Sequence, residues 1–197
     1  MRSLVLGPVR SGKSARAASL ARSCGKSVIF AATAAVDPAD EEMAERVARH
    51  RADRPASWRV VETAAPAGPS LVALLREAGP HECVIIDALG TWIAAIMFDL
   101  ERATADGSVT NPAALERAGN ELADAVAAAR ADVVIVAEEV GWGVVPASAQ
   151  GRVFRDTLGR LVQRIARVVD RVELVVAGYA VDLRAIGHPL EGETREL

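Results

Sequence analysis

The chain has 197 residues, which suits one domain with a substantial hydrophobic core. A hydrophobic share of 51% and a charged share of 25% indicate an α/β protein and exclude a disordered or fibrous chain. The formal net charge of −3 excludes a global basic field for nucleic-acid binding, and no stretch approaches the roughly 18 apolar residues of a membrane span. We therefore expect one cytoplasmic domain over residues 1–197, without a nucleic-acid partner, signal peptide or membrane span.

Short apolar runs alternate along the chain with longer segments of helical period. The apolar runs predict buried strands at 3–7, 27–33, 83–89, 131–139 and 172–178, with a short additional strand at 59–63. The periodic segments predict helices at 14–25, 37–54, 70–79, 112–131 and 152–170. Residues 99–112 are polar and punctuated, which is typical of a mobile loop, and 184–197 are expected to be irregular. The alternation predicts a mainly parallel sheet flanked by helices on both faces.

A phosphate-loop pattern lies between the first expected strand and the first expected helix. The pattern GxxxxGK[ST] is met by Gly7, Pro8, Val9, Arg10, Ser11, Gly12, Lys13 and Ser14. Lys13 is one of only two lysines among 23 basic residues, and an ammonium fits between phosphates better than the planar guanidinium of arginine. The backbone N–H groups and the helix start would hold the phosphates. The alternative is a glycine turn capped by serine, which the complete pattern in this context disfavours.

An acidic partner for the phosphate loop is expected at the end of another buried strand. Asp87 ends the run VIID and suits a Walker-B role, in which it holds Mg²⁺ together with the Ser14 hydroxyl. A strand-end aspartate that only caps a turn is the alternative. Together the two elements predict phosphate chemistry on a nucleotide, without naming the substrate.

A histidine occupies the apolar stripe of the expected helix 37–54. Met43, Val47 and His50 follow each other at helical spacing, and arginines surround His50 near the helix end. One interpretation is a half-buried histidine bonded to a backbone carbonyl. The other is a neutral imidazole that attacks a phosphorus atom whose oxygens are neutralised by the arginines. The pattern alone leaves both interpretations open.

A glycine-rich run, EEVGWGVVP at 138–146, directly follows an expected strand. A loop at the carboxyl edge of a parallel sheet is a common place for ligands, although a simple surface turn has the same composition. Trp142 is either a packing or a substrate-contacting residue, whereas Trp58 and Trp92 are expected in the core.

These motifs together resemble a known family, the bifunctional adenosylcobinamide kinase/adenosylcobinamide-phosphate guanylyltransferases of cobalamin biosynthesis. The matching segments are 7–14, 31–33, 40–62, 84–92, 139–164 and 172–184. They cover most of the chain outside 99–131, and the combination is far more specific than the phosphate loop alone.

The resemblance implies two reactions and a set of site residues. ATP or GTP would phosphorylate a hydroxyl of adenosylcobinamide; GTP would then guanylylate His50, and the GMP would pass to the new phosphate. Lys13 and His50 are the implied catalytic residues, and Ser14 and Asp87 the implied Mg²⁺ ligands. The implied nucleotide-binding positions are residues 7–14, Thr33, Ala34, Ala35, Arg51, Ala52, Asp53, Arg54, Glu62 and Asp87. The family also implies a RecA-like phosphate-loop fold and a homo-oligomer, with a trimer as one form.

The chain departs from the family pattern at several positions, namely Pro8, Arg49, Ala88 and Glu138. Glu138 replaces an expected asparagine and bears most on phosphate or metal contacts. Two other functions remain as alternatives: a small-molecule kinase without guanylyltransferase activity, and a regulatory module that binds nucleotide without turnover.

Overall fold

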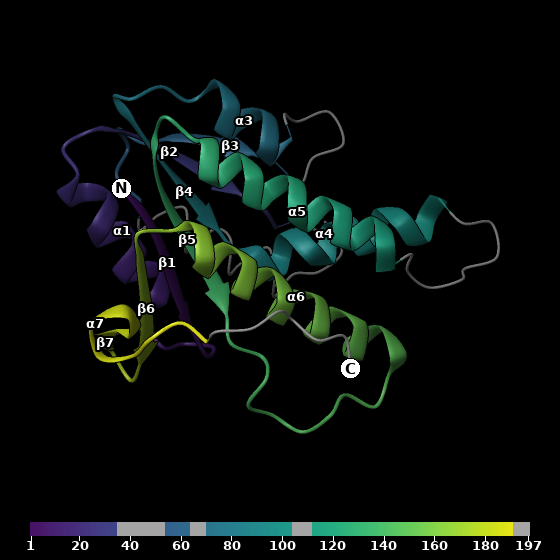
Figure 1. Cartoon of the computed structure of the whole chain (residues 1–197). Helices are drawn as coiled ribbons and strands as arrows, with labels where there is room; N and C mark the ends of the chain where they lie inside the picture. Colours follow the sequence, from purple (N-terminus) through teal and green to yellow (C-terminus); the bar gives the residue numbers. More distant parts are fainter. Residues whose placement is uncertain (35–53, 64–69, 104–111, 191–197) are drawn as a thin grey trace.

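Among the described residues, one seven-stranded sheet organises the fold, in the strand order β3-β2-β4-β5-β1-β6-β7 (Figure 1). The computed structural model describes residues 1–34, 54–63, 70–103 and 112–190. The strands are β1 (Arg2–Gly7), β2 (Ser27–Ala32), β3 (Arg59–Glu62), β4 (Glu82–Asp87), β5 (Asp132–Glu138), β6 (Arg171–Val176) and β7 (Tyr179–Asp182). Every pairing is parallel except that between β6 and β7. The mainly parallel sheet flanked by helices is therefore confirmed, including the short strand expected at 59–63.

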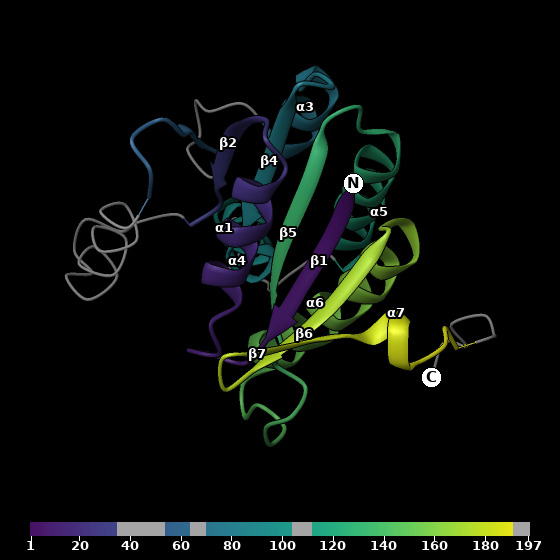
Figure 2. The same cartoon turned by 90° about the vertical axis from the view of Figure 1, so that its left-hand side faces the viewer.

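Helices cover both faces of this sheet. Their bounds are α1 (Lys13–Ser23), α3 (Leu71–Glu77), α4 (Leu89–Ala103), α5 (Pro112–Ala128), α6 (Ala149–Val168) and α7 (Leu183–Ile186). Figure 2 shows α1 on one side of the sheet and α5 and α6 on the other. The helix expected at 37–54 falls almost entirely outside the described residues. No helix within the described ranges is long and apolar enough to span a membrane.

The central strands are buried on both faces, which explains their continuous apolar sequences. Alternate residues belong to two separate hydrophobic clusters: Ile135 of β5 packs with α3 to α6, while its neighbour Val134 packs with α1. Leu158 and Ile165 from α6 contribute to the first cluster, and Leu20 from α1 to the second. Because helices cover both faces of the sheet, polar side chains at the ends of the strands are the ones that a ligand can reach.

Helix α4 was missed by the sequence interpretation. Residues 99–103, expected as part of a loop, form the last turn of α4, and the remainder of that expected loop at 104–111 is not described. The helix packs Ile93 against the core beside half-buried Trp92 and Met97, while Asp99 is exposed. Asp99 thus belongs to the polar face of an amphipathic helix and not to a loop.

The carboxy-terminal part of the sheet also differs from expectation. The strand expected at 172–178 ends at Val176, turns at Ala177 and Gly178, both with positive φ, and returns as antiparallel β7. Positive φ at both central residues is the geometry of a type I′ hairpin turn. The expected irregular segment 184–197 begins instead with the last residues of α7, whose first turn is capped by the Asp182 carboxylate.

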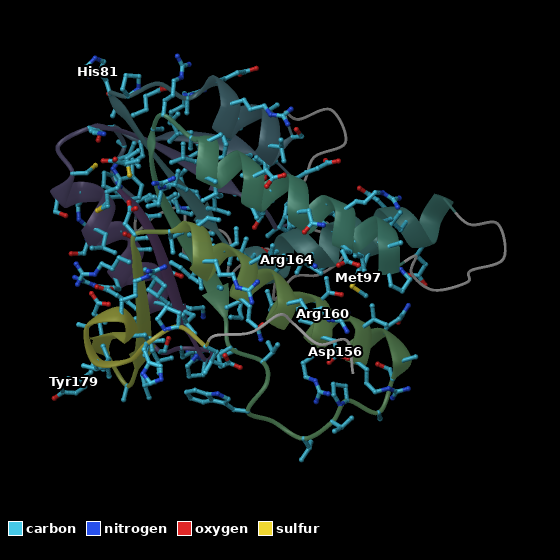
Figure 3. All side chains as sticks on the ribbon, in the orientation of Figure 1. His81, Met97, Asp156, Arg160, Arg164 and Tyr179 are labelled. Carbon is cyan, nitrogen blue, oxygen red and sulfur yellow. The ribbon has the colours of Figure 1, made fainter. Side chains whose placement is uncertain are left out.

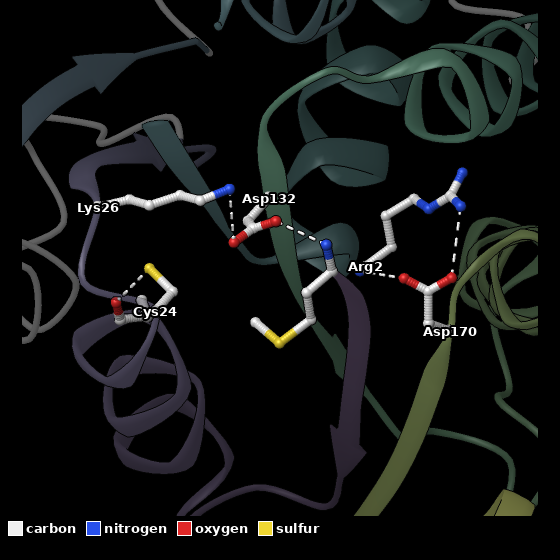
Figure 4. Close-up of polar contacts among 7 residues, drawn as sticks. Arg2, Cys24, Lys26, Asp132 and Asp170 are labelled. Carbon is white, nitrogen blue, oxygen red and sulfur yellow. Dashed lines mark hydrogen bonds and ion pairs between the residues drawn. The ribbon is translucent and has the colours of Figure 1, made fainter. Parts of the chain in front are cut away.

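The amino ends of the strands are joined by charged contacts (Figure 4). The Asp132 carboxylate lies 2.6 Å from the Met1 amino group and 3.0 Å from Lys26 Nζ. On the neighbouring strand, the Arg2 backbone N–H donates to Asp170 at 2.7 Å. These contacts join β1, β5 and the start of β6 at the edge opposite the phosphate loop.

Candidate functional site

The phosphate loop connects the carboxyl end of β1 to the start of α1. Gly12 has φ +99°, a left-handed conformation that L side chains rarely adopt, and a Cβ on Gly7 would lie 2.3 Å from the carbonyl oxygen of Val175. The Ser11 carbonyl accepts a hydrogen bond of 3.0 Å from Gly178 N–H. The loop is therefore seated directly against the β6–β7 hairpin.

Lys13 stands at the first position of α1 and is only 8% exposed. Its Nζ donates to the Pro8 carbonyl at 3.3 Å, which uses one of the three donors of the ammonium. The buried Ser11 Oγ has no hydrogen-bond partner among the described residues. A buried hydroxyl without a partner and a lysine at a helix N-terminus suit a bound phosphate, because both donate to anionic oxygens.

Ser14 and Asp87 lie together, as the sequence predicts. Ser14 Oγ donates to Asp87 Oδ1 at 3.4 Å. Neighbouring oxygen ligands of one octahedral Mg²⁺ lie about 3 Å apart, since each is about 2.1 Å from the ion. No group of three or more histidine, cysteine or acidic side chains gathers around a possible metal position within the described ranges. The pair therefore fits Mg²⁺ in the way such ions are usually held, by one or two protein oxygens with phosphates and water.

Thr33 and Glu62 extend this edge away from the phosphate loop. Ala32 pairs with Glu62 on one side and with Asp87 on the other, so the two acidic residues stand two strand spacings, about 10 Å, apart. The fully buried Thr33 donates its hydroxyl to the Ala88 carbonyl at 2.7 Å, which ties β2 to the residue after Asp87. Half-buried Ala34 follows it.

Arg54 lies on the α1 face of the sheet. Its guanidinium carbon is 3.6 Å from the centroid of the Phe30 ring, and Trp58 stacks on the same ring with centroids 6.3 Å apart. A guanidinium over an aromatic face is a favourable cation–π contact. Trp58 and Trp92, expected in the core, are half-buried and pack against it, whereas Trp142 is exposed.

Five of the residues implied by the resemblance lie outside the described residues, namely Ala35, His50, Arg51, Ala52 and Asp53. Their roles remain predictions.

Glu138 reaches the start of α4 from the strand between the two phosphate motifs. It pairs with Gly7 in the β1–β5 register, and its Oε2 accepts from the Gly90 backbone N–H at 2.9 Å. A carboxylate at a helix N-terminus is favoured by the helix dipole. Glu138 therefore has a structural partner in place of the contacts expected of an asparagine.

A buried ion pair beneath the phosphate loop was not anticipated. Glu173 of β6, 1% exposed, accepts from Arg16 Nε at 2.7 Å and Arg16 Nη2 at 2.8 Å. Arg171 Nη2 lies 2.6 Å from the same carboxylate. A single charged residue in an otherwise apolar strand indicates that a partner of opposite charge exists. The sequence pattern does not say which residue that partner is.

Comparison with known proteins identifies the family. Residues 3–183 match the family model described as cobinamide kinase/cobinamide phosphate guanyltransferase. The chain belongs to this family. It is 36% identical to the bifunctional adenosylcobalamin biosynthesis protein CobP of Pseudomonas aeruginosa, covering 96% of this chain and all of that one. It is also 36% identical to CobU of Salmonella typhimurium, covering 92% and 98% of the two chains. The expected bifunctional kinase and guanylyltransferase of cobalamin biosynthesis is thus confirmed at the level of the family.

The fold has a more distant relative among solved structures. An ATPase from the type III secretion system of pathogenic bacteria superposes with a TM-score of 0.53 at 11% identity, covering 95% of this chain and 58% of that one. At this identity the likeness concerns the fold alone, and it agrees with the phosphate-loop architecture.

Replacing Glu173 by glutamine should destabilise the protein at neutral pH by about 2 kcal/mol, because two arginines lose a charged partner. The hydrogen bond from Arg16, opposed by burial and aided by the charges of Arg16 and Arg171, lowers the pKa of Glu173. A lowered pKa in the folded state means that the stabilisation is present at pH 7 and is lost as the pH falls below about 4. Urea unfolding at pH 7 and below about pH 4 measures the free energy of unfolding of both proteins. The difference in this free energy between wild type and Glu173→Gln should be smaller at the acidic pH.

Glu116→Gln is the matched control, since that carboxylate is 57% exposed and pairs with Arg164 at the surface. It should change the unfolding free energy by less than about 1 kcal/mol. Equal losses in the two variants would contradict the role given to the buried pair.

Lys13→Ala should lower the rate of phosphoryl transfer by at least about 100-fold, because a preorganised charge at the phosphates is lost. Lys26→Ala removes the other lysine, which lies at the opposite edge of the sheet beside Asp132, and should keep the rate near that of wild type. The measurement is the initial rate of phosphoryl transfer at saturating nucleotide, compared among Lys13→Ala, Lys26→Ala and wild type. Similar activity in Lys13→Ala and wild type would contradict the assignment.

Proposed function

We propose that this chain phosphorylates adenosylcobinamide at the phosphate loop and then transfers GMP to the product through His50. The observation that carries the proposal is the junction of β1 and α1. Buried Lys13, the Ser14–Asp87 pair and a Ser11 Oγ without a hydrogen-bond partner among the described residues all lie there. The description of the matching family names cobinamide, which identifies the acceptor.

In the first reaction the acceptor hydroxyl oxygen attacks the γ-phosphorus of ATP or GTP. The bond from that phosphorus to the β,γ-bridging oxygen breaks, a nucleoside diphosphate leaves and the hydroxyl proton is released. Lys13 and the backbone N–H groups of the loop bind the transferred oxygens as negative charge shifts toward the leaving group. Mg²⁺, held by Ser14 and Asp87, would neutralise phosphate charge.

In the second reaction an imidazole nitrogen of His50 attacks the α-phosphorus of GTP and pyrophosphate leaves. An oxygen of the acceptor phosphate then attacks the same phosphorus, the P–N bond breaks and the imidazole is regenerated. The covalent intermediate lets pyrophosphate depart before the acceptor binds, so one nucleotide site serves both displacements.

The edge formed by Asp87, Ala32 and Glu62 supports a position for the nucleoside. These residues continue from the phosphate loop across β4, β2 and β3 in one register. We assign Thr33, Ala34, Arg54 and Glu62 to nucleotide binding on this side. Ala35, Arg51, Ala52 and Asp53 lie outside the described residues and are assigned to nucleotide binding from the resemblance alone.

Three further properties belong to the proposal. The chain works as one domain, it assembles as a homo-oligomer such as a trimer, and it acts in the cytoplasm, where its nucleotide substrates are made. A kinase without guanylyltransferase activity is the alternative that the following experiment separates.

Incubation with GTP labelled at the α-phosphorus should place an acid-labile, base-stable label on the protein. The label should be absent from His50→Ala and present in His81→Ala, whose histidine is exposed at the loop before β4, far from the phosphate loop (Figure 3). Mass spectrometry of the adduct assigns the residue. An unlabelled wild-type protein that still phosphorylates cobinamide would reduce the function to that of a kinase.

A further inference from the structure

An exposed apolar segment follows β5 beside the phosphate loop. Trp142 is 66% exposed, Val144 93% and Val145 65%. Clustered exposed apolar side chains commonly mark an interaction site, because leaving them in water costs about 25 cal/mol per Å² of apolar surface. None of these three side chains belongs to the hydrophobic clusters of the described core.

The segment is held at both ends, so its apolar residues occupy a defined place. At the start, Glu139 N–H donates to the Gly7 carbonyl at 3.0 Å, and Gly141 N–H donates to Glu139 Oε1 at 2.7 Å. At the end, Arg152 Nη1 donates to the Pro146 carbonyl at 3.0 Å. The first of these bonds attaches the segment to the first residue of the phosphate loop.

A further exposed apolar side chain lies in the phosphate loop itself. Val9 is 67% exposed. Tyr179, 79% exposed, belongs to the hairpin whose Gly178 bonds to Ser11, but Figure 3 shows it on the outer side of that hairpin. In Figure 1 the segment after β5 forms the loop below the sheet, well apart from the β6–β7 turn.

The strand order places this surface between the two phosphate motifs and outside the strands proposed for the nucleoside. The apolar segment leaves β5, which lies between β1 and β4, whereas the nucleoside side continues from β4 through β2 to β3. The acceptor must bring its hydroxyl, and later its phosphate, to the phosphate loop. A corrinoid is a large macrocycle that bears methyl groups as well as amide side chains, and an apolar surface next to that point suits its ring and methyl groups.

We propose that Trp142, Val144 and Val145, together with Val9 of the adjoining phosphate loop, form the surface on which the corrinoid macrocycle packs. The inference rests on the proposed function for the identity of the acceptor. Trp142 supplies the largest rigid contact, since an indole offers much apolar area with few rotatable bonds. The acceptor site thus lies at the carboxyl end of β5, next to the phosphate loop.

The test compares Trp142→Ala with Phe98→Ala, which removes an aromatic residue 55% exposed on α4. Trp142→Ala should raise the KM for cobinamide roughly tenfold, the loss expected for one large apolar contact, and leave the KM for nucleotide unchanged. Trp142→Phe should restore most of the affinity, and Phe98→Ala should match wild type. Equilibrium dialysis of cobinamide without nucleotide gives the same comparison independently of activity.

Two results would overturn the proposal. One is an unchanged KM and dissociation constant for cobinamide in Trp142→Ala. The other is dissociation of an oligomer in that variant, measured by light scattering, which would make the surface an interface with a second copy. Labelling of wild type by α-labelled GTP is measured in parallel; its absence would refute the guanylyltransferase step without affecting the comparison of cobinamide affinities.

Discussion

The buried contact between Arg16 and Glu173 is the constraint on which the phosphate loop depends. The carboxylate is 1% exposed and receives two hydrogen bonds from one guanidinium. Arg16 stands one turn into the helix that begins at Lys13, so the pair orients the turn that carries both Lys13 and Ser14. Burying a charge costs free energy that only a well-aligned ion pair recovers. The two side chains are therefore restricted to a small range of relative positions. The helix start is held against β6 as a result.

The hairpin adds a second restraint on the same loop. Gly7 approaches the Val175 carbonyl too closely for any side chain, and Gly178 bonds to Ser11. The loop thus lies between its own strand and the antiparallel extension of the sheet. This explains why a short antiparallel β7 accompanies an otherwise parallel sheet, since its turn supports the backbone that would surround the phosphates.

The sequence predicted what local patterns determine and missed what depends on distant partners. The phosphate loop, Asp87 and the buried strands follow from spacing and apolar runs of a few residues. The start of α4 was missed because its apolar sequence continues directly from the preceding strand. Its end was missed because the polar residue Asp99 was interpreted as the start of a loop. The hairpin was missed because Ala177 is an unusual residue for positive φ. No pattern within β6 could name Arg16 as the partner of Glu173, since more than 150 residues separate them.

Parallel strands bring distant residues to one end of the sheet, and the proposed nucleoside and acceptor surfaces both lie there. Asp87 and Glu62 lie to one side of β5, and the hairpin lies to the other. Glu138, at the end of β5, accepts a hydrogen bond from the Gly90 backbone N–H at the start of α4. A kinase and a guanylyltransferase both need a nucleotide and an acceptor to meet at one phosphorus atom. In the proposed function, the phosphate loop meets that requirement with the nucleoside placed toward β2 and β3 and the acceptor placed at the end of β5.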